Sequence, residues 1–162
     1  MSTSIVPPAK VTIINLDGDT PPLVAQLNPK ELSVDKTVAW QKKENTGGDQ
    51  PHLQFSAADG RIMSFELWFD TYETAENVHA KYVQHLIKLA MVRDASDGAP
   101  EDKKRPPRLK VVWGSGALPA FEGVLESVGT KYTMFLPDGT PVRATCNVKV
   151  KEASRASFKK GA

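Results

Sequence analysis

Apolar and polar residues alternate with a period of two along much of the chain, which is typical of half-buried β-strands. The run 142–152 is the clearest case. Its inward set is Val142, Ala144, Cys146, Val148 and Val150, and its outward set is Arg143, Thr145, Asn147, Lys149 and Lys151. The run 64–70 also alternates, with Phe65, Leu67 and Phe69 on one face and Ser64, Glu66, Trp68 and Asp70 on the other. Trp68 therefore stands on the polar face, where a large apolar side chain is unexpected.

Further runs of this kind predict strands at 11–15, 23–27, 32–40, 53–57, 61–69, 109–113, 121–128 and 131–136. Turn-forming residues between the first two runs predict a hairpin. The run 32–40 places Leu32, Val34, Val38 and Trp40 on one face, with Lys36 as the exception. The sequence PDGTP at 137–141 predicts a tight turn before the last strand.

One segment shows helical spacing instead. Over residues 74–92 an apolar stripe is formed by Val78, Tyr82, Leu86 and Leu89. Asp70 with Glu73, or Thr74 alone, could cap the start of this helix. Strands precede and follow the helix without βαβ alternation. The sequence therefore predicts a mainly β fold with one packed α-helix, arranged as an antiparallel β-barrel or sandwich.

Polar segments lie at both ends and between the strands. Residues 1–9 are predicted to be a flexible arm, residues 10–152 the folded domain and residues 153–162 a basic C-terminal tail. The segments 41–51 and 93–108 are predicted to be long solvated loops, since both are rich in charged residues, glycine and proline.

Composition excludes several classes of function. The 162 residues carry 21 Lys and Arg against 19 Asp and Glu, a net charge of +2, which indicates neither nucleic acid nor a membrane surface as a partner. No apolar run approaches the length of a membrane span, and no secretory signal is visible. A single cysteine allows no internal disulfide, so a cytoplasmic site of synthesis is expected.

Candidate chemistry is sparse. His79 and His85 are six residues apart on the expected helix and do not share a face, and His52 has no acidic cluster beside it. Cys146 is an inward strand residue, which indicates a small core side chain rather than a nucleophile. Ser115, in GSG, lacks the setting of a nucleophile elbow. The basic run KKRPPR at 103–108 has no interleaved aromatic residues. We therefore expect no enzyme, no cofactor and no metal site.

The misplaced Trp68 has two explanations. A large apolar side chain on an outer face is usually covered by a second layer. That layer is either the protein's own helix, which follows directly in the chain, or a neighbouring subunit.

Five blocks of the chain, taken together and in this order, resemble contractile injection system proteins of the tube-like N-terminal domain type. They are LNPKELSVDKTVAW (27–40), SFELWFDTYE (64–73), VVWG (111–114), FEGVLESV (121–128) and YTMFLPDGTPVRA (132–144). The resemblance covers about residues 10–152. It implies a tail-tube fold and a place in a phage-tail-like particle that can be released from the cell.

The resemblance also implies partners. The similar family member is a homohexameric ring between the trimeric spike hub and the inner tube, in contact with other baseplate proteins, and it initiates tube assembly. Such proteins often carry a C-terminal LysM module, whereas this chain ends KEASRASFKKGA. We therefore expect either a truncated linker to that module or a member without it.

The two polar loops and Trp68 are the candidates for contacts between subunits. The named residues are Trp68, Lys42, Lys43, Glu44, Asn45, Asp102, Lys103, Lys104 and Arg105. Two alternatives stay open: an inner-tube protein stacked in many copies, and, from another class, a soluble β-barrel that binds a small ligand. The latter needs a pocket with convergent polar groups, which no sequence motif nominates.

Overall fold

The structure is a computed structural model that describes residues 9–18, 20–44, 47–50, 52–92, 105–114, 116 and 118–153. Its nine strands within these ranges are β1 (Val11–Asn15), β2 (Leu23–Val24), β3 (Leu32–Asp35), β4 (Val38–Lys43), β5 (His52–Ala58), β6 (Ile62–Asp70), β7 (Arg108–Trp113), β8 (Phe121–Phe135) and β9 (Pro141–Glu152). One short helix, π-helical over His79–Val83 and continued by α1 (Gln84–Lys88), stands between β6 and β7.

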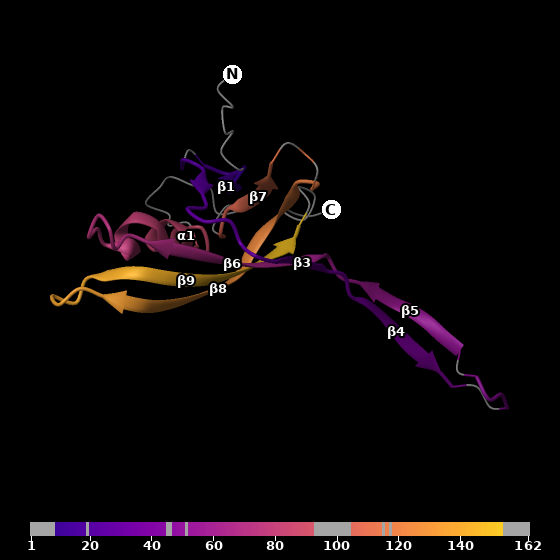
Figure 1. The fold of residues 1–162 in the computed structure, drawn as a ribbon. Helices are drawn as coiled ribbons and strands as arrows, with labels where there is room; N and C mark the ends of the chain where they lie inside the picture. The colour runs from indigo at the N-terminus through magenta and orange to yellow at the C-terminus, as the bar shows by residue number, and fades with distance from the viewer. Residues whose placement is uncertain are drawn as a thin grey trace, which may run out of the picture.

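All strand pairs are antiparallel. Seven strands form one sheet in the order β2-β1-β7-β8-β9-β6-β3, and β4 and β5 form a separate two-stranded sheet. Figure 1 shows β6, β9 and β8 as one layer, with the helix, β1 and β7 on its upper side. The predicted class, a mainly β antiparallel sandwich with one packed helix, is confirmed.

The core forms between these layers because the alternating strands turn their apolar faces inward. On β9 the five predicted inward residues are all buried, as are Phe65, Leu67 and Phe69 on β6. The helix contributes Val78, Leu86 and Leu89, and the ring of Tyr82 stacks on Phe69 with centroids 4.8 Å apart. The predicted apolar stripe of the helix is therefore confirmed.

The helix is shorter than predicted. Residues 72–75 form a turn in which Ala75 has a φ of 53°, so a helix cannot start at residue 74. The carboxamide oxygen of Asn77 instead accepts the backbone N–H groups of His79 and Ala80, at 3.0 and 3.3 Å. The predicted caps were wrong, since Asp70 accepts the N–H of Tyr72 within the preceding turn. The helix ends at Lys88, not near residue 92.

Two strand predictions were also wrong. The run 32–40 is two strands, β3 and β4, which belong to different sheets. The chain breaks at Lys36, whose ammonium donates to the carbonyl of Asp59, while the N–H of Asp59 donates to the carbonyl of Thr37. The runs 121–128 and 131–136, by contrast, are one strand, because β9 pairs with β8 continuously through Gly129 and Thr130.

The tight turn before the last strand is confirmed. Gly139 has a φ of 91°, and the Asp138 carboxylate accepts the N–H of Thr140 at 3.0 Å. The backbone of Leu136 and Thr140 closes the turn with a 2.8 Å hydrogen bond. In the GSG segment the structure describes Gly114 and Gly116. Both have positive φ, a backbone conformation typical of glycine in tight turns.

Candidate subunit interface

The polar face of β6 carries the groove that contains Trp68. The Trp68 side chain is 41% exposed, and the Lys30 ammonium lies 5.9 Å from its ring centroid. The groove has a volume of about 630 Å³, and its other lining residues are Glu31, Ser33, Ser64, Phe65, Glu66, Asn147, Val148 and Lys149. An exposed aromatic ring among polar groups is typical of a contact surface.

The helix does not cover Trp68. It packs on the opposite face of β6, where Tyr82 stacks on Phe69. Phe69, its cross-strand partner Ala144 on β9 and the partner of Ala144 on β8, Tyr132, lie in one row across the sheet. The hydroxyl of Tyr132 lies 2.5 Å from Nδ1 of His79 on the helix. Cover by the protein's own helix was therefore the wrong explanation for Trp68.

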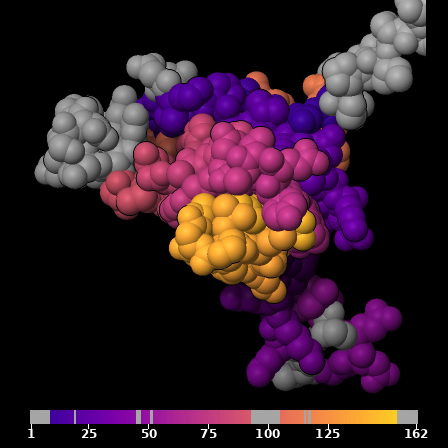
Figure 2. Space-filling view, turned by 60° about the vertical axis from the view of Figure 1, so that its left-hand side comes forward, coloured from indigo at the N-terminus to yellow at the C-terminus, as the bar shows by residue number. Residues whose placement is uncertain are grey.

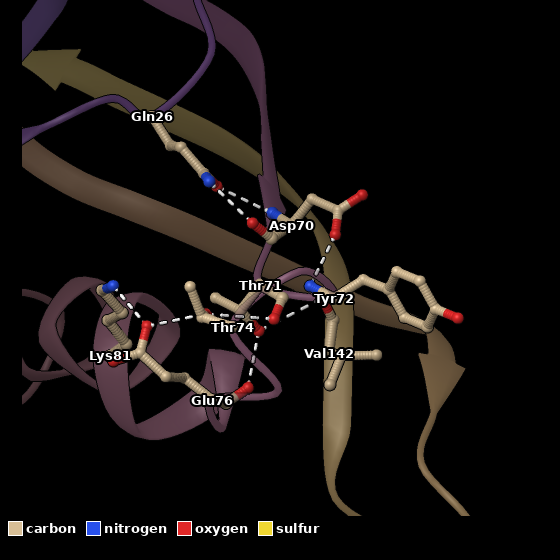
Figure 3. Close-up of polar contacts among 8 residues, drawn as sticks. All are labelled: Gln26, Asp70, Thr71, Tyr72, Thr74, Glu76, Lys81 and Val142. Atoms are coloured by element: carbon tan, nitrogen blue, oxygen red, sulfur yellow. Dashed lines mark hydrogen bonds and ion pairs between the residues drawn. The ribbon is translucent and has the colours of Figure 1, made fainter.

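A polar corner fixes the end of β6 just beyond Trp68. The Gln26 carboxamide makes two bonds with the backbone of Asp70, accepting its N–H at 2.7 Å and donating to its carbonyl at 2.6 Å (Figure 3). The Thr71 hydroxyl donates to the carbonyl of Glu76 at 2.6 Å, which closes the turn toward the helix. Arg143 forms an ion pair with the Asp70 carboxylate at 3.0 Å. The Tyr72 N–H and this guanidinium lower the pKa of Asp70, so the corner is fully charged at neutral pH.

The hairpin β4–β5 stands apart from the body and has no core of its own. Figures 1 and 2 show it projecting from the rest of the molecule. Cross-strand pairs place Val38 opposite Ala58, Trp40 opposite Phe55 and Lys42 opposite Leu53. These residues share one face of the hairpin, and on that face Trp40 is 56%, Phe55 55% and Leu53 62% exposed. An isolated two-stranded hairpin is marginal in water, so a partner surface is expected to stabilise it.

Trp40, Leu53 and Phe55 were not among the predicted contact candidates. The sequence pattern placed Trp40 on one strand face with Leu32 and Val34. The structure places it on the separate hairpin, where its ring packs edge-to-face on Phe55 at 5.7 Å between centroids. The alternation of Leu53 and Phe55 with Gln54 and Ser56 marked an apolar face, yet only the pairing shows that nothing in the described part of the chain covers it.

The predicted loop contacts divide into three groups. Lys42 and Lys43 end β4 and, with Glu44, are exposed near the tip of the hairpin, so the loop is shorter than 41–51. Asn45, Asp102, Lys103 and Lys104 lie outside the described residues. Arg105 binds its own chain, where its guanidinium pairs with the Asp17 carboxylate at 2.8 Å.

Asp17 anchors the entry to β7. Burial alone would raise the pKa of Asp17, but the N–H of Arg108, at 2.8 Å, and the guanidinium of Arg105 outweigh it and lower that pKa. The carboxylate is thus charged at neutral pH and holds residues 105–108 beside β1. This makes Arg105 a structural residue of the body.

Within the described residues the large sheet has three free edges. Its two end strands are β2, which pairs only with β1, and β3, which pairs only with β6. Residues 127–135 of β8, an interior strand, pair with β9 on one side and with no described strand on the other. Free edges present unpaired backbone donors and acceptors, which are ready to accept a strand from another chain.

Two of the residues considered for chemistry, Cys146 and His85, lie in the packed body. Burial raises the pKa of the Cys146 thiol, which is fully buried among core residues. Burial, with a contribution from Lys88, lowers the pKa of His85 on the helix. Within the described residues no three His, Cys, Asp or Glu side chains gather as metal ligands. No helix in that part of the chain is long and apolar enough to cross a membrane.

A family model of contractile injection system tube proteins matches residues 9–160, nearly the whole chain. The chain belongs to this family. The family shows a structural role in a contractile injection system, as the resemblance implied, and agrees with the expectation that this tube protein is not an enzyme. A search of curated proteins found no match.

Proposed function

We propose that this tube-family protein forms a ring of six copies that joins the trimeric spike hub of the baseplate to the inner tube and initiates tube assembly. The observation that carries the ring is that one sheet leaves both the β3 edge and the second half of β8 unpaired within the described residues. A soluble sheet with two open edges is an aggregation hazard unless another chain covers them.

Two different edges favour a closed ring. If the β8 edge of one copy meets the β3 edge of the next, the contact is heterologous, with a different surface from each copy. Heterologous contacts produce a ring when the rotation between neighbours closes, and an open filament when it does not. Six copies would then join their sheets side by side around a channel. The β3 edge and the open half of β8 would both be covered in such a ring.

The five sequence blocks favour the adaptor ring between hub and tube. The matching family description, a tube protein, favours a second candidate, an inner-tube protein stacked in many copies. Both roles need the same ring and the same fold. They differ in the number of copies per particle and in which proteins lie above and below the ring.

Affinity purification of particles through the tagged protein, with absolute quantification by mass spectrometry, tests this proposal. The adaptor role predicts recovery with sheath, tube and spike proteins, at about two copies per copy of a trimeric hub subunit. Copy numbers equal to those of the major tube protein would establish the stacked role instead. Recovery without any injection-system protein would contradict both.

A further inference from the structure

Two surfaces carry exposed aromatic residues that the described part of the chain leaves uncovered. One is the apolar hairpin face, defined as Val38, Trp40, Leu53 and Phe55. The other is the Trp68 groove described above. We propose that the Trp68 groove of one copy receives the apolar hairpin face of a second copy. This inference rests on the proposed ring and names one of its contacts.

The hairpin points away from the Trp68 end of the groove of its own chain. The hairpin leaves the body at the start of β6 and projects away from it (Figure 1). Trp68 lies six residues along β6 from Ile62, a distance of about 20 Å in the opposite direction along the strand. The groove thus runs along β6 from Ser64, near the base of the hairpin, to Trp68 at its far end, and the hairpin points away from that far end.

The two surfaces match in the spacing of aromatic and charged groups. On the hairpin face Trp40 and Lys42 are two residues apart, and in the groove Glu66 and Trp68 are two residues apart. Each pair therefore stands on one face of a strand with its side chains about 6.6 Å apart. When the two tryptophan rings are in contact, Lys42 can reach Glu66.

The charges of Lys42 and Glu66 are available for a contact with another chain. Within the described residues neither Lys42 nor Glu66 forms an ion pair, whereas Asp70 and Arg143 at the neighbouring position satisfy each other. Lys30 and Lys149 line the same groove and would repel Lys42 of an incoming hairpin that lay beside them. Glu66, two residues from Trp68, and Glu31 are the acidic residues of the groove lining with which an incoming lysine can pair.

In a ring built by this contact, every copy has both its hairpin face and its groove occupied, each by one neighbour. Each copy gives its hairpin to one neighbour and receives the hairpin of the other, so the contact repeats around a ring. Apolar cover on both sides would offset the ordering of a hairpin that is marginal alone. The groove is thus a second subunit contact, on the sheet face beside the β3 edge, since Ser33 of β3 lines it.

Site-directed crosslinking tests the inference. Lys42→Cys and Glu66→Cys are made in separate full-length chains, mixed under conditions where the wild-type chain assembles, and treated with a short bismaleimide. The matched control pairs Lys43→Cys, whose side chain lies on the other face of the hairpin, with the same Glu66→Cys chain. We expect a crosslinked dimer from position 42 and several-fold less from position 43. The native Cys146 is buried and is unchanged in both mixtures.

A charge exchange gives a second readout. Glu66→Lys should weaken assembly about tenfold, and Lys42→Glu in the same chain should restore it, as expected for a close charge pair. Assembly that forms normally but gives no crosslink from position 42 and ignores the charge exchange would overturn this contact and leave the ring standing. Failure of the wild-type chain to assemble in particles or in solution would overturn the ring, and this contact with it.

Discussion

Replacing Trp68 with alanine separates a folding role from an assembly role. The indole is 41% exposed, so folding buries about three-fifths of a side chain that offers roughly 200 Å². At about 25 cal/mol per Å², that burial corresponds to at most ~3 kcal/mol. Such area sums are upper bounds, and the retained β-carbon keeps part of the contact. We therefore expect Trp68→Ala to lower the free energy of unfolding of the monomer by about 2 kcal/mol or less.

The adjacent Phe69 is the matched control. It is 1% exposed, on the opposite face of the same strand, and stacked on Tyr82 of the helix. Phe69→Ala should cost about 3–5 kcal/mol, the range for a fully buried aromatic residue. The contrast between two neighbouring positions follows only from which face the helix covers.

Urea denaturation of dilute monomer measures the first effect, and sedimentation velocity of concentrated protein measures assembly. The prediction is that Trp68→Ala remains folded and loses assembly. A Trp68→Ala variant as unstable as Phe69→Ala, whose folded fraction still assembles like the wild type, would refute the reasoning.

Three further predictions test other parts of the structure. Burial lowers the pKa of His85 from 6.5, so the folded protein favours the neutral ring. The contribution of His85 to stability is therefore complete above pH 6.5 and is lost as the pH falls below that value. Between pH 7.5 and about 5.5 the urea midpoint should fall further in the wild type than in His85→Gln, and equal falls would contradict this. Gly139→Ala should cost about 1 kcal/mol, because φ is 91° and nothing within 4 Å opposes the new methyl group, and an unchanged denaturation midpoint would contradict a conformational cost. Backbone amides of β4 and β5 should exchange rapidly in the monomer and be protected in the assembled ring, as measured by hydrogen-exchange mass spectrometry, whereas equal protection in both states would exclude the hairpin from the interface.

The sequence predicted the body of the fold well where burial follows the period of the strand. On β9 and β6 each side chain alternates between core and surface, so the pattern reports the packing directly. The helix stripe was also correct, because Val78, Leu86 and Leu89 can be buried together only at helical spacing.

The same pattern failed where an apolar face has no layer above it. Trp40 continued the alternation of β3, but the break at Lys36 turns β4 into a separate hairpin, and periodicity does not distinguish a covered face from an uncovered one. The long strand β8 was divided at Gly129 for a related reason, since local propensity is overridden by pairing with β9.

Trp68 illustrates what the sequence could and could not provide. Its place on the polar face of β6 marked it as anomalous without any structure. The sequence did not show on which face of β6 the helix packs, because the segment 71–78 is long enough to lead to either side. The positive φ of Ala75 and the local cap at Asn77 determine where the helix begins.

Native mass spectrometry of the purified full chain, from low micromolar to high concentration, tests the central claim that this tube-family protein is a ring subunit. We expect a discrete species with the mass of six chains, absent in Trp68→Ala at the same concentration. A chain that remains monomeric at every concentration, and also remains monomeric when its hub and tube partners are added, would contradict it.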